Sequence, residues 1–305
     1  MKILIIGATG FIGRALVPHL VSERFDIVCI SRNVNAARKI LGNHINILPW
    51  DSRTTQGLLP ALSGADAVVN LAGESLAKGR WTDKRKQELL DSRVVTGKLL
   101  SEAILSMPVR PGVVLQASAM GFYGPQTDGP VDESAGQGPG FLAEMNRQWE
   151  SSAIPLKSAG VRVVILRTGV VLGKDGGMLE QLLIPFRFYA GTTLGSGRQY
   201  LSWIHLADNI RAIGHLLRNS ASEGPYNLTT PNPVTMAELT RGISIAVGKP
   251  AWMRVPAFML KAIFGKMADE TLLASQQVMP SRLLSEGFRF SYPELAPALS
   301  DIFSK

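Results

Sequence analysis

The fold is decided by the first stretch of the chain, which reads Lys2-Ile3-Leu4-Ile5-Ile6-Gly7-Ala8-Thr9-Gly10-Phe11-Ile12-Gly13. Its apolar run predicts a buried strand, and residues 11–22 carry apolar side chains at helical spacing. Between strand and helix, Gly7 permits a tight turn, Gly10 lets the backbone approach a ligand, and Gly13 lets the helix pack on the strand. Such a loop presents backbone N–H groups at the positive end of a helix. We therefore predict a pyrophosphate-binding loop formed by Gly7, Thr9, Gly10, Phe11, Ile12 and Gly13.

Short β-branched runs alternate with longer amphipathic stretches along the first half of the chain. The runs predicted as strands are residues 2–6, 26–30, 45–48, 66–70, 113–117 and 161–166, and the predicted helices are 11–22, 82–107 and 141–159. Pro155 is expected to kink or end the last helix. Alternation of this kind is typical of a parallel sheet with helices on its faces. The sequence thus predicts an α/β fold with a Rossmann-type doubly wound parallel sheet.

The character of the sequence changes after about residue 170, where glycines separate short segments that we interpret as loops lining a cleft. A later helix is indicated by the capping-box pattern Thr235-Met236-Ala237-Glu238, and it is expected to end near Gly248. We therefore predict two lobes. Residues 1–172 form the dinucleotide-binding domain, which also receives 202–220, and residues 173–201 and 221–305 form a smaller α/β lobe that binds the substrate.

Composition suits a compact soluble protein, because apolar residues make up 46% of the 305 residues and charged residues 18%. The single cysteine, Cys29, has no partner in the chain, and the four histidines show no metal-ligand spacing, so neither a disulfide nor a metal site is predicted. Glycines interrupt the apolar N-terminus, unlike a signal peptide, and no apolar run reaches the roughly 20 residues that span a membrane. We expect a cytoplasmic protein with no membrane partner.

A formal net charge of +8 favours anionic partners, which could be nucleic acid or small ligands such as dinucleotides and sugar nucleotides. Much of the basic charge falls between residues 78 and 98, in a stretch that reads as a helix and also holds Asp83, Glu88 and Asp91. No zinc-finger spacing or aromatic-basic RNA-binding signature accompanies it. We interpret it as a solvated helix face, with a nucleic-acid or partner-binding scaffold as the weaker alternative.

The end of the second predicted strand decides between the two nicotinamide cofactors. An acidic residue at this place would accept hydrogen bonds from the ribose 2′-OH of NAD, whereas this chain reads Ser31-Arg32. The Arg32 guanidinium and the Ser31 hydroxyl suit a 2′-phosphate, and no carboxylate is expected beside them to repel it. NADP is therefore predicted ahead of NAD. Asp51, after the third strand, is expected near the adenine, and Gly73, after the fourth, allows close passage of the cofactor.

Four separate segments resemble the extended short-chain dehydrogenase/reductase superfamily, which includes sugar-nucleotide epimerases and dehydratases. They are Gly7-x-x-Gly10-x-x-Gly13, Asn70-Leu71-Ala72-Gly73, the stretch from Ser118 to Tyr123-Gly124, and Leu166-Arg167-x-Gly169-Val170-Val171-Leu172-Gly173. Further motifs are similar to a bacterial epimerase-like subgroup that ends in a small domain of its own, among them Gly73-Glu74, Arg80-Trp81-Thr82, Trp149-Glu150, the stretch from Gly197 to His205, and Gly287-Phe288-Arg289-Phe290. The resemblance covers essentially the whole chain. It implies further cofactor contacts from Leu71, Ala72, Gly73, Glu74, Arg93 and Arg167.

The chemistry of that superfamily uses a tyrosine as general acid/base, with a lysine four residues later that lowers the tyrosine pKa. None of the five tyrosines in this chain is followed by a lysine at that spacing. Where the motif is expected, the chain carries Phe141 and Met145 instead. The resemblance therefore predicts the fold and the cofactor better than the reaction.

Two residues are the remaining candidates for catalysis. Tyr123 follows the fifth strand, near the expected nicotinamide, and Arg93 or Arg167 could supply the positive charge that the missing lysine would have given. Ser118 is the candidate partner hydroxyl, but it lies one residue too far from Tyr123 and would need a bulge in the strand.

Two functions remain open on the sequence alone. The first is an NADP-dependent epimerase or reductase, hence an isomerase or oxidoreductase, that acts on a sugar nucleotide or a similar small molecule through Tyr123. The second is a non-catalytic NADP-binding sensor or regulatory protein, which the missing tyrosine and lysine favour. Against the second, the resemblance implies a substrate pocket lined by Trp81, Arg198, Trp203 and His205. No oligomeric state follows from the sequence, and a homodimer stays open.

Overall fold

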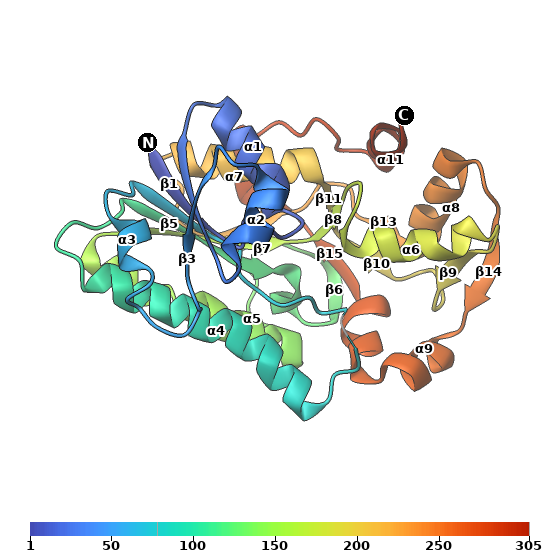
Figure 1. Ribbon diagram of the computed structural model, residues 1–305. Helices are drawn as coiled ribbons and strands as arrows, with labels where there is room; N and C mark the ends of the chain where they lie inside the picture. The colour runs from blue at the N-terminus through green and yellow to red at the C-terminus, as the bar shows by residue number, and fades with distance from the viewer. Residues whose placement is uncertain (78, 305) are drawn as a thin grey trace.

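The computed structural model describes residues 1–77 and 79–304, so that Lys78, at the start of the basic stretch, lies outside the described residues. Its centre is a seven-stranded parallel sheet in the order β12-β7-β5-β4-β1-β2-β3 (Figure 1). These strands are β1 (Lys2–Ile6), β2 (Asp26–Ser31), β3 (Asn46–Pro49), β4 (Ala67–Asn70), β5 (Val113–Ala119), β7 (Arg162–Thr168) and β12 (Gly224–Leu228). The order reverses between β1 and β4, which confirms the doubly wound Rossmann-type fold.

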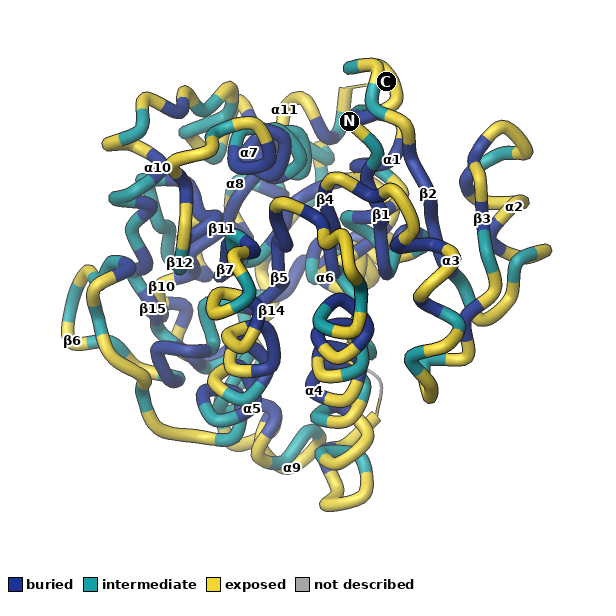
Figure 2. The backbone as a smooth tube through the Cα atoms, turned by 90° about the vertical axis from the view of Figure 1, so that its left-hand side faces the viewer, coloured by how far each residue is buried: buried dark blue, intermediate teal, exposed yellow. Residues whose placement is uncertain are grey.

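Helices cover both faces of this sheet (Figure 1). One face carries α1 (Gly13–Ser22), α2 (Val34–Leu41) and α7 (Leu206–Arg218), and the other carries α3 (Leu59–Leu62), α4 (Asp83–Leu105) and α5 (Phe141–Ser151). Each face has its own apolar core, because successive side chains of a strand point to opposite faces. Figure 2 shows the consequence: the central strands are buried, and the outward faces of the helices are exposed.

Local sequence signals explain where these helices begin and end. The Thr82 hydroxyl accepts the backbone N–H of Arg85 at 3.2 Å and caps α4. Helix α5 ends at Ser151, and a 3₁₀ segment, η2 (Ile154–Ala159), follows with Pro155 in its first turn, as predicted from the missing N–H of proline. The capping box of Thr235 and Glu238 opens α8 (Met236–Val247), which ends at Gly248 in the left-handed region, also as predicted.

The second lobe is smaller and has its own core, built mainly from α6 (Gly177–Arg187), α8 and α11 (Leu295–Phe303). The strands outside the large sheet form two-stranded pairs: β8 (Val170–Leu172) with β11 (Trp203–His205), β9 (Gly191–Leu194) with β14 (Ala251–Val255), β10 (Tyr200–Leu201) with β13 (Val234–Thr235), and β6 (Gln126–Val131) with β15 (Ser275–Val278). The remaining short elements are η1 (Met120–Tyr123), α9 (Ala257–Phe264), the π-helix η3 (Ala268–Leu272) and α10 (Ser281–Ser285). The interpretation of residues 170–200 as loops was therefore wrong for α6, whose apolar residues lie between flanking glycines.

The two lobes share chain segments. Strand β12 is the edge of the large sheet, although it falls in the range 221–305 that the sequence analysis gave to the second lobe. Leu283 and Phe288, from the last part of the chain, lie in the core on the α1 face of the sheet. The division into domains at the predicted boundaries remains a proposal.

Within residues 1–77 and 79–304, no helix is long and apolar enough to cross a membrane. No group of three or more His, Cys, Asp or Glu side chains in that part of the chain could hold a metal ion. Cys29 lies inside β2, and its burial raises the pKa of the thiol to about 12.

Candidate functional site

The Gly7–Gly13 loop joins β1 to α1 at the point where the strand order reverses. Gly7 has a φ of +81°, and a Cβ on it would lie 2.8 Å from the carbonyl carbon of Leu71, so only glycine fits this turn beside β4. A Cβ on Gly10, by contrast, would meet only the Gly7 carbonyl oxygen, at 3.3 Å. Among the described residues, the backbone N–H groups of Phe11 and Ile12 have no hydrogen-bond partner. Open space, free donors and a helix N-terminus together fit a pyrophosphate.

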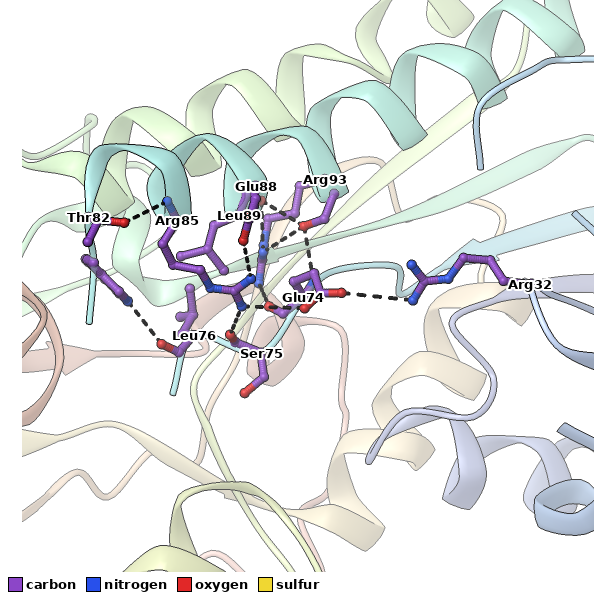
Figure 3. A network of polar contacts seen from close by, with 11 residues as sticks. Arg32, Glu74, Ser75, Leu76, Thr82, Arg85, Glu88, Leu89 and Arg93 are labelled. Atoms are coloured by element: carbon purple, nitrogen blue, oxygen red, sulfur yellow. Dashed lines mark hydrogen bonds and ion pairs between the residues drawn. The ribbon is translucent and has the colours of Figure 1, made fainter. Parts of the chain in front are cut away.

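Arg32 directly follows β2, and 74% of its side chain is exposed. Figure 3 shows it reaching toward Glu74. The prediction that no carboxylate lies beside Arg32 is wrong, because Glu74 Oε1 lies 3.9 Å from Arg32 Nη2. Glu74 also approaches Arg85 of α4, with Oε2 3.4 Å from Arg85 Nη2. Glu74 therefore bridges two arginines, and it comes from the loop after β4 rather than from β2.

Arg93 and Arg85 of α4 hold the loop that carries Glu74 (Figure 3). Arg93 Nη2 donates to the carbonyl oxygen of Glu74 at 2.9 Å, and Arg85 Nη2 donates to that of Ser75 at 2.9 Å. The Arg93 guanidinium also packs over the Trp149 ring, at 5.1 Å, and burial lowers its pKa to about 10. A Cβ on Gly73 would lie 3.1 Å from this guanidinium, so a larger residue there would push Arg93 by a few tenths of an ångström. The basic stretch is thus partly a structural support rather than a free solvated face.

A cleft of about 580 Å³ lies between the sheet and the second lobe. We define it by its main lining groups: Phe11 from the phosphate loop, residues 74–77 and Arg93, residues 119–121 after β5, the α5 residues Leu142, Met145, Asn146 and Trp149, residues 168–171, Met178, Glu180 and Gln181 of α6, and Met267, Glu270, Thr271, Leu272 and Gln276 from the C-terminal region. Because it starts beside the Gly7–Gly13 loop, the cleft continues the groove expected to hold a dinucleotide. A volume of this size is typical of small-molecule sites.

Helix α5 carries the two positions where the tyrosine and lysine were expected, and of these only Met145 is among the described lining residues. Met145 is buried and lines the cleft. Phe141 packs edge-on against Trp81, with ring centroids 5.4 Å apart. Both side chains are apolar, so neither can transfer a proton or hold a ribose by charge.

Ser118 and Tyr123 belong to a buried polar network beside the cleft. The Ser118 hydroxyl donates to Glu150 at 2.6 Å, and Arg167 donates to both Glu150 oxygens at 2.9 Å. Arg167 also donates to the Tyr123 hydroxyl at 3.0 Å, which in turn donates to Asn227 at 2.8 Å. Of the two arginines considered for Tyr123, the structure thus places Arg167 against it.

This network turns both candidate catalytic residues away from the cleft. Strand β5 pairs with β7 without a register shift from Val113 to Ala119, so the bulge that Ser118 would need is not there. Ala119 lines the cleft, and the neighbouring Ser118 side chain contacts Glu150 instead. Tyr123 is buried, and this burial raises the pKa of its hydroxyl, so that even less of it is deprotonated and able to accept a proton at neutral pH.

The four residues expected to line the substrate pocket are not brought together. Trp203 is fully buried in the core of the second lobe, and its indole N–H donates to the Asn232 carbonyl oxygen at 3.0 Å. His205 caps α7 through Nδ1, and its ring lies 4.1 Å from that of Tyr292. Trp81 packs behind Leu142 and Met145, and Arg198 is exposed. None of the four is in the cleft lining as the described residues define it, so we drop them from the proposed pocket.

Two predicted cofactor positions are engaged in local turns. The Asp51 carboxylate accepts the backbone N–H groups of Arg53 and Thr54, at 2.8 and 3.3 Å, in an exposed loop. The Ser31 hydroxyl donates to the carbonyl oxygen of Asn33 at 3.1 Å. Both side chains lie at the carboxyl ends of strands, where open parallel sheets bind ligands.

Three site residues were missed by sequence reasoning. Asn146 and Trp149 of α5 are buried, and neither the Asn146 amide oxygen nor the Trp149 indole N–H has a hydrogen-bond partner within the described chain. Their spacing of three residues, which places them on one helix face, is a signal that could have found them. Glu270 accepts the backbone N–H groups of Phe141 and Leu142 at 3.1 and 2.8 Å. No sequence signal links it to α5.

Comparison with known proteins agrees with this geometry. The model of the NAD dependent epimerase/dehydratase family matches residues 3–229, and a domain of unknown function, DUF1731, matches residues 255–302. An epimerase family protein of Mycobacterium bovis is 39% identical over 297 residues, which cover 97% of this chain and 96% of that protein.

Two solved structures extend the comparison. That of human epimerase family protein SDR39U1 (isoform 2) with NADPH has a TM-score of 0.89 at 32% identity and covers 99% of both chains. That of UDP-glucuronic acid 4-epimerase from Bacillus cereus, in complex with UDP-glucuronic acid and NAD, has a TM-score of 0.82 at 19% identity, covering 99% of this chain and 98% of that one, and shows the shared fold alone. With the family model spanning the whole large sheet and relatives aligned over nearly the full length, the chain belongs to the NAD dependent epimerase/dehydratase family.

Proposed function

We propose that this protein binds NADP(H) in the groove that runs from the Gly7–Gly13 loop into the cleft. The open position at Gly10 and the free N–H groups of Phe11 and Ile12 fit the pyrophosphate. Arg32 offers a cation to a 2′-phosphate, and Glu74 offers an acceptor to a ribose hydroxyl. The NADPH named with the human relative supports NADP(H) as the first choice and leaves NAD(H) as the second.

Arg32→Ala is expected to weaken NADPH binding by about 1 to 3 kcal/mol, the scale of a lost charge-assisted hydrogen bond. NADH has no 2′-phosphate, so its affinity should hardly change. Glu74→Gln removes the negative charge 3.9 Å from Arg32 but keeps an acceptor oxygen for the ribose, so it should tighten NADPH binding rather than weaken it. Isothermal titration calorimetry of both cofactors with the three proteins measures these differences. Equal losses for NADPH and NADH in Arg32→Ala would remove Arg32 from the phosphate site.

We further propose that the protein is an NADP(H)-responsive binding protein rather than a sugar-nucleotide epimerase. A bound nicotinamide would supply hydride chemistry at the cleft, but proton transfer is left to the protein. The observation that carries the proposal is helix α5, where apolar Phe141 and Met145 stand at the positions expected for the tyrosine and lysine and Met145 lines the cleft, while the Tyr123 hydroxyl is bound to Arg167 and Asn227. The second lobe, which lines the same cleft, would then respond to whether the ligand and NADP(H) are bound.

A reductase or epimerase with another proton donor is the second candidate. The cleft has room for a small molecule, and its lining includes the hydroxyls of Ser75, Thr168 and Thr271 and the carboxyl of Glu270. The Thr168 and Thr271 hydroxyls already donate to backbone carbonyl oxygens, and Glu270 accepts two backbone N–H groups, so Ser75 is the described hydroxyl left to donate a proton. This observation favours an oxidoreductase or isomerase of unusual site chemistry over one that uses Tyr123.

Turnover assays separate the two candidates. NADPH binding is measured by its fluorescence. UDP-glucose and UDP-glucuronic acid are then incubated with the protein and NADP⁺, which can accept hydride from the sugar, and a panel of small carbonyl compounds is incubated with the protein and NADPH. We expect binding of NADPH without epimerisation or NADPH oxidation above the protein-free rate. Tyr123→Phe should not alter any slow residual rate, since its hydroxyl does not face the cleft. Fast turnover of a sugar nucleotide would contradict the binding-protein proposal, and its loss in Tyr123→Phe would restore Tyr123 as the proton donor.

A further inference from the structure

The cleft has an acidic and apolar lining, which is unusual for a site expected to receive phosphates. Among the described lining residues, the charged ones are Glu74, Arg93, Glu180 and Glu270. Arg93 already donates to the carbonyl oxygens of Leu89 and Glu74 and to the Ser92 hydroxyl, which leaves two of the five N–H groups of a guanidinium. The Glu74 carboxylate is paired with Arg85, whereas Glu180 has no ion-pair partner in the described chain. The described lining therefore contains one buried cation, Arg93, most of whose N–H groups are already hydrogen-bonded. It also contains two carboxylates besides Glu74, namely Glu180 and Glu270.

Glu270 is held in the cleft by the N-terminus of α5. Its two oxygens accept the N–H groups of the first two residues of that helix, Phe141 and Leu142. Gly140 makes room for this contact, since a Cβ on it would lie 3.1 Å from Glu270 Oε2. The position at which a helix end attracts an anion is therefore filled by a carboxylate of the chain itself. An anionic ligand would meet a negative group there instead of free donors.

The α5 wall also carries two unsatisfied polar atoms. The Asn146 amide oxygen is an acceptor and the Trp149 indole N–H is a donor; both residues line the cleft, are more than nine-tenths buried, and lack partners among the described residues. Buried polar groups are costly to leave unpaired, but each of these atoms exposes less than 1 Å² to solvent, so a ligand in the cleft would reach them only after the side chains move.

We infer that the cleft takes an uncharged or cationic, largely apolar organic molecule and rejects sugar nucleotides, with Glu270 as a specificity-determining residue. The inference rests on the proposed function, since it concerns the second ligand of the same NADP(H)-binding protein. It also gives a role to the C-terminal region matched by the domain of unknown function: residues 267–276 form one wall of the cleft, and Glu270 sets its charge.

Three aromatic probes of similar size test the sign of the charge preference: benzylamine, benzyl alcohol and benzoate. UDP-glucose serves as the sugar nucleotide. Their affinities are measured by ligand-observed NMR titration on the NADP⁺-loaded and the free protein. Benzylamine and benzyl alcohol are expected to bind about tenfold or more tightly than benzoate, as fixed carboxylates in a partly buried site dictate. UDP-glucose is expected not to bind the cleft.

Variants of the lining carboxylates test whether this charge preference arises in the cleft. Glu270→Gln should lower the benzylamine-to-benzoate affinity ratio by about threefold to tenfold. Glu180→Gln, at an exposed position of α6, should also lower this affinity ratio. It replaces Glu270→Gln in the test if that variant folds poorly. Glu238→Gln is the matched control, because Glu238 also caps a helix but lies outside the cleft lining, and it should leave the ratio unchanged.

The outcomes separate this inference from the proposed function. Benzoate or UDP-glucose binding as tightly as benzylamine, or a ratio unchanged in both Glu270→Gln and Glu180→Gln, would overturn the inference. NADPH fluorescence is measured on the same samples. Normal NADPH binding with a reversed probe preference overturns the inference alone, whereas absent NADPH binding with the expected preference overturns the proposed function alone.

Discussion

Gly10→Val is expected to lower the affinity for NADPH at least about 100-fold while the fold stays intact. A branched side chain would fill the open space at Gly10 and push a pyrophosphate away from the N–H groups of Phe11 and Ile12. Each charge-assisted hydrogen bond lost in this way is worth about 1.5 to 3 kcal/mol. The fold should survive, because the added Cβ would meet only the Gly7 carbonyl oxygen, at 3.3 Å. Calorimetric titration with NADPH, with circular dichroism on the same sample, measures both parts.

Gly136→Val is the matched control for this experiment. Gly136 lies in an exposed loop, its φ is not positive, and nothing lies within 4 Å of a Cβ built on it. The substitution should leave both NADPH affinity and the spectrum unchanged. If Gly10→Val kept the affinity of the unmodified protein, the loop could not be the site of the pyrophosphate.

Glu150→Gln is expected to destabilise the protein by about 3 to 5 kcal/mol, because it leaves the buried Arg167 guanidinium without its counter-charge. Glu150 accepts hydrogen bonds from Ser118 and from two nitrogens of Arg167, and the neutral amide cannot replace all of them. Urea unfolding measures the free energy difference. The double variant Glu150→Gln with Arg167→Met should recover part of the loss, because it removes the buried charge as well.

An exposed ion pair supplies the comparison. Glu144 pairs with Arg147 on the surface of α5, and Glu144→Gln should shift the unfolding midpoint little, because solvent screens the pair. A loss in Glu150→Gln no larger than in Glu144→Gln would show that the Ser118–Glu150–Arg167–Tyr123 network does not carry the stability assigned to it.

Most of the large sheet could be predicted from the sequence, because fully buried parallel strands leave a strong signal of short β-branched runs between helices. The six runs proposed as strands are β1 to β5 and β7 of the structure. Strand β12, whose sequence is Gly224-Pro225-Tyr226-Asn227-Leu228, carries glycine, proline and asparagine and gave no such signal. It forms at the edge beside β7, where only one side needs ladder hydrogen bonds.

The site was less predictable because its decisive contacts join distant parts of the chain. The spacing of the glycines in the phosphate loop indicates directly where the backbone needs space. This pattern correctly predicted a strand-loop-helix unit. By contrast, no sequence pattern predicts that Glu74 lies beside Arg32 or that Glu270 caps α5. Trp203 shows a second difficulty: a tryptophan in a motif of a substrate loop can serve the core as well as a pocket, and burial alone decides which.

The position of β12 also bears on how the chain folds as it is synthesised. The sheet cannot gain its last strand until Leu228 has left the ribosome. The hydrogen bond from Tyr123 to Asn227, which completes the buried network of Arg167, also cannot form before then. Leu283 and Phe288, which complete the core on the α1 face, emerge later still. The N-terminal part therefore stays open on one side while the rest is made, and contacts of such long sequence separation form slowly. An unfinished sheet edge is the surface that a holding chaperone would cover during this interval.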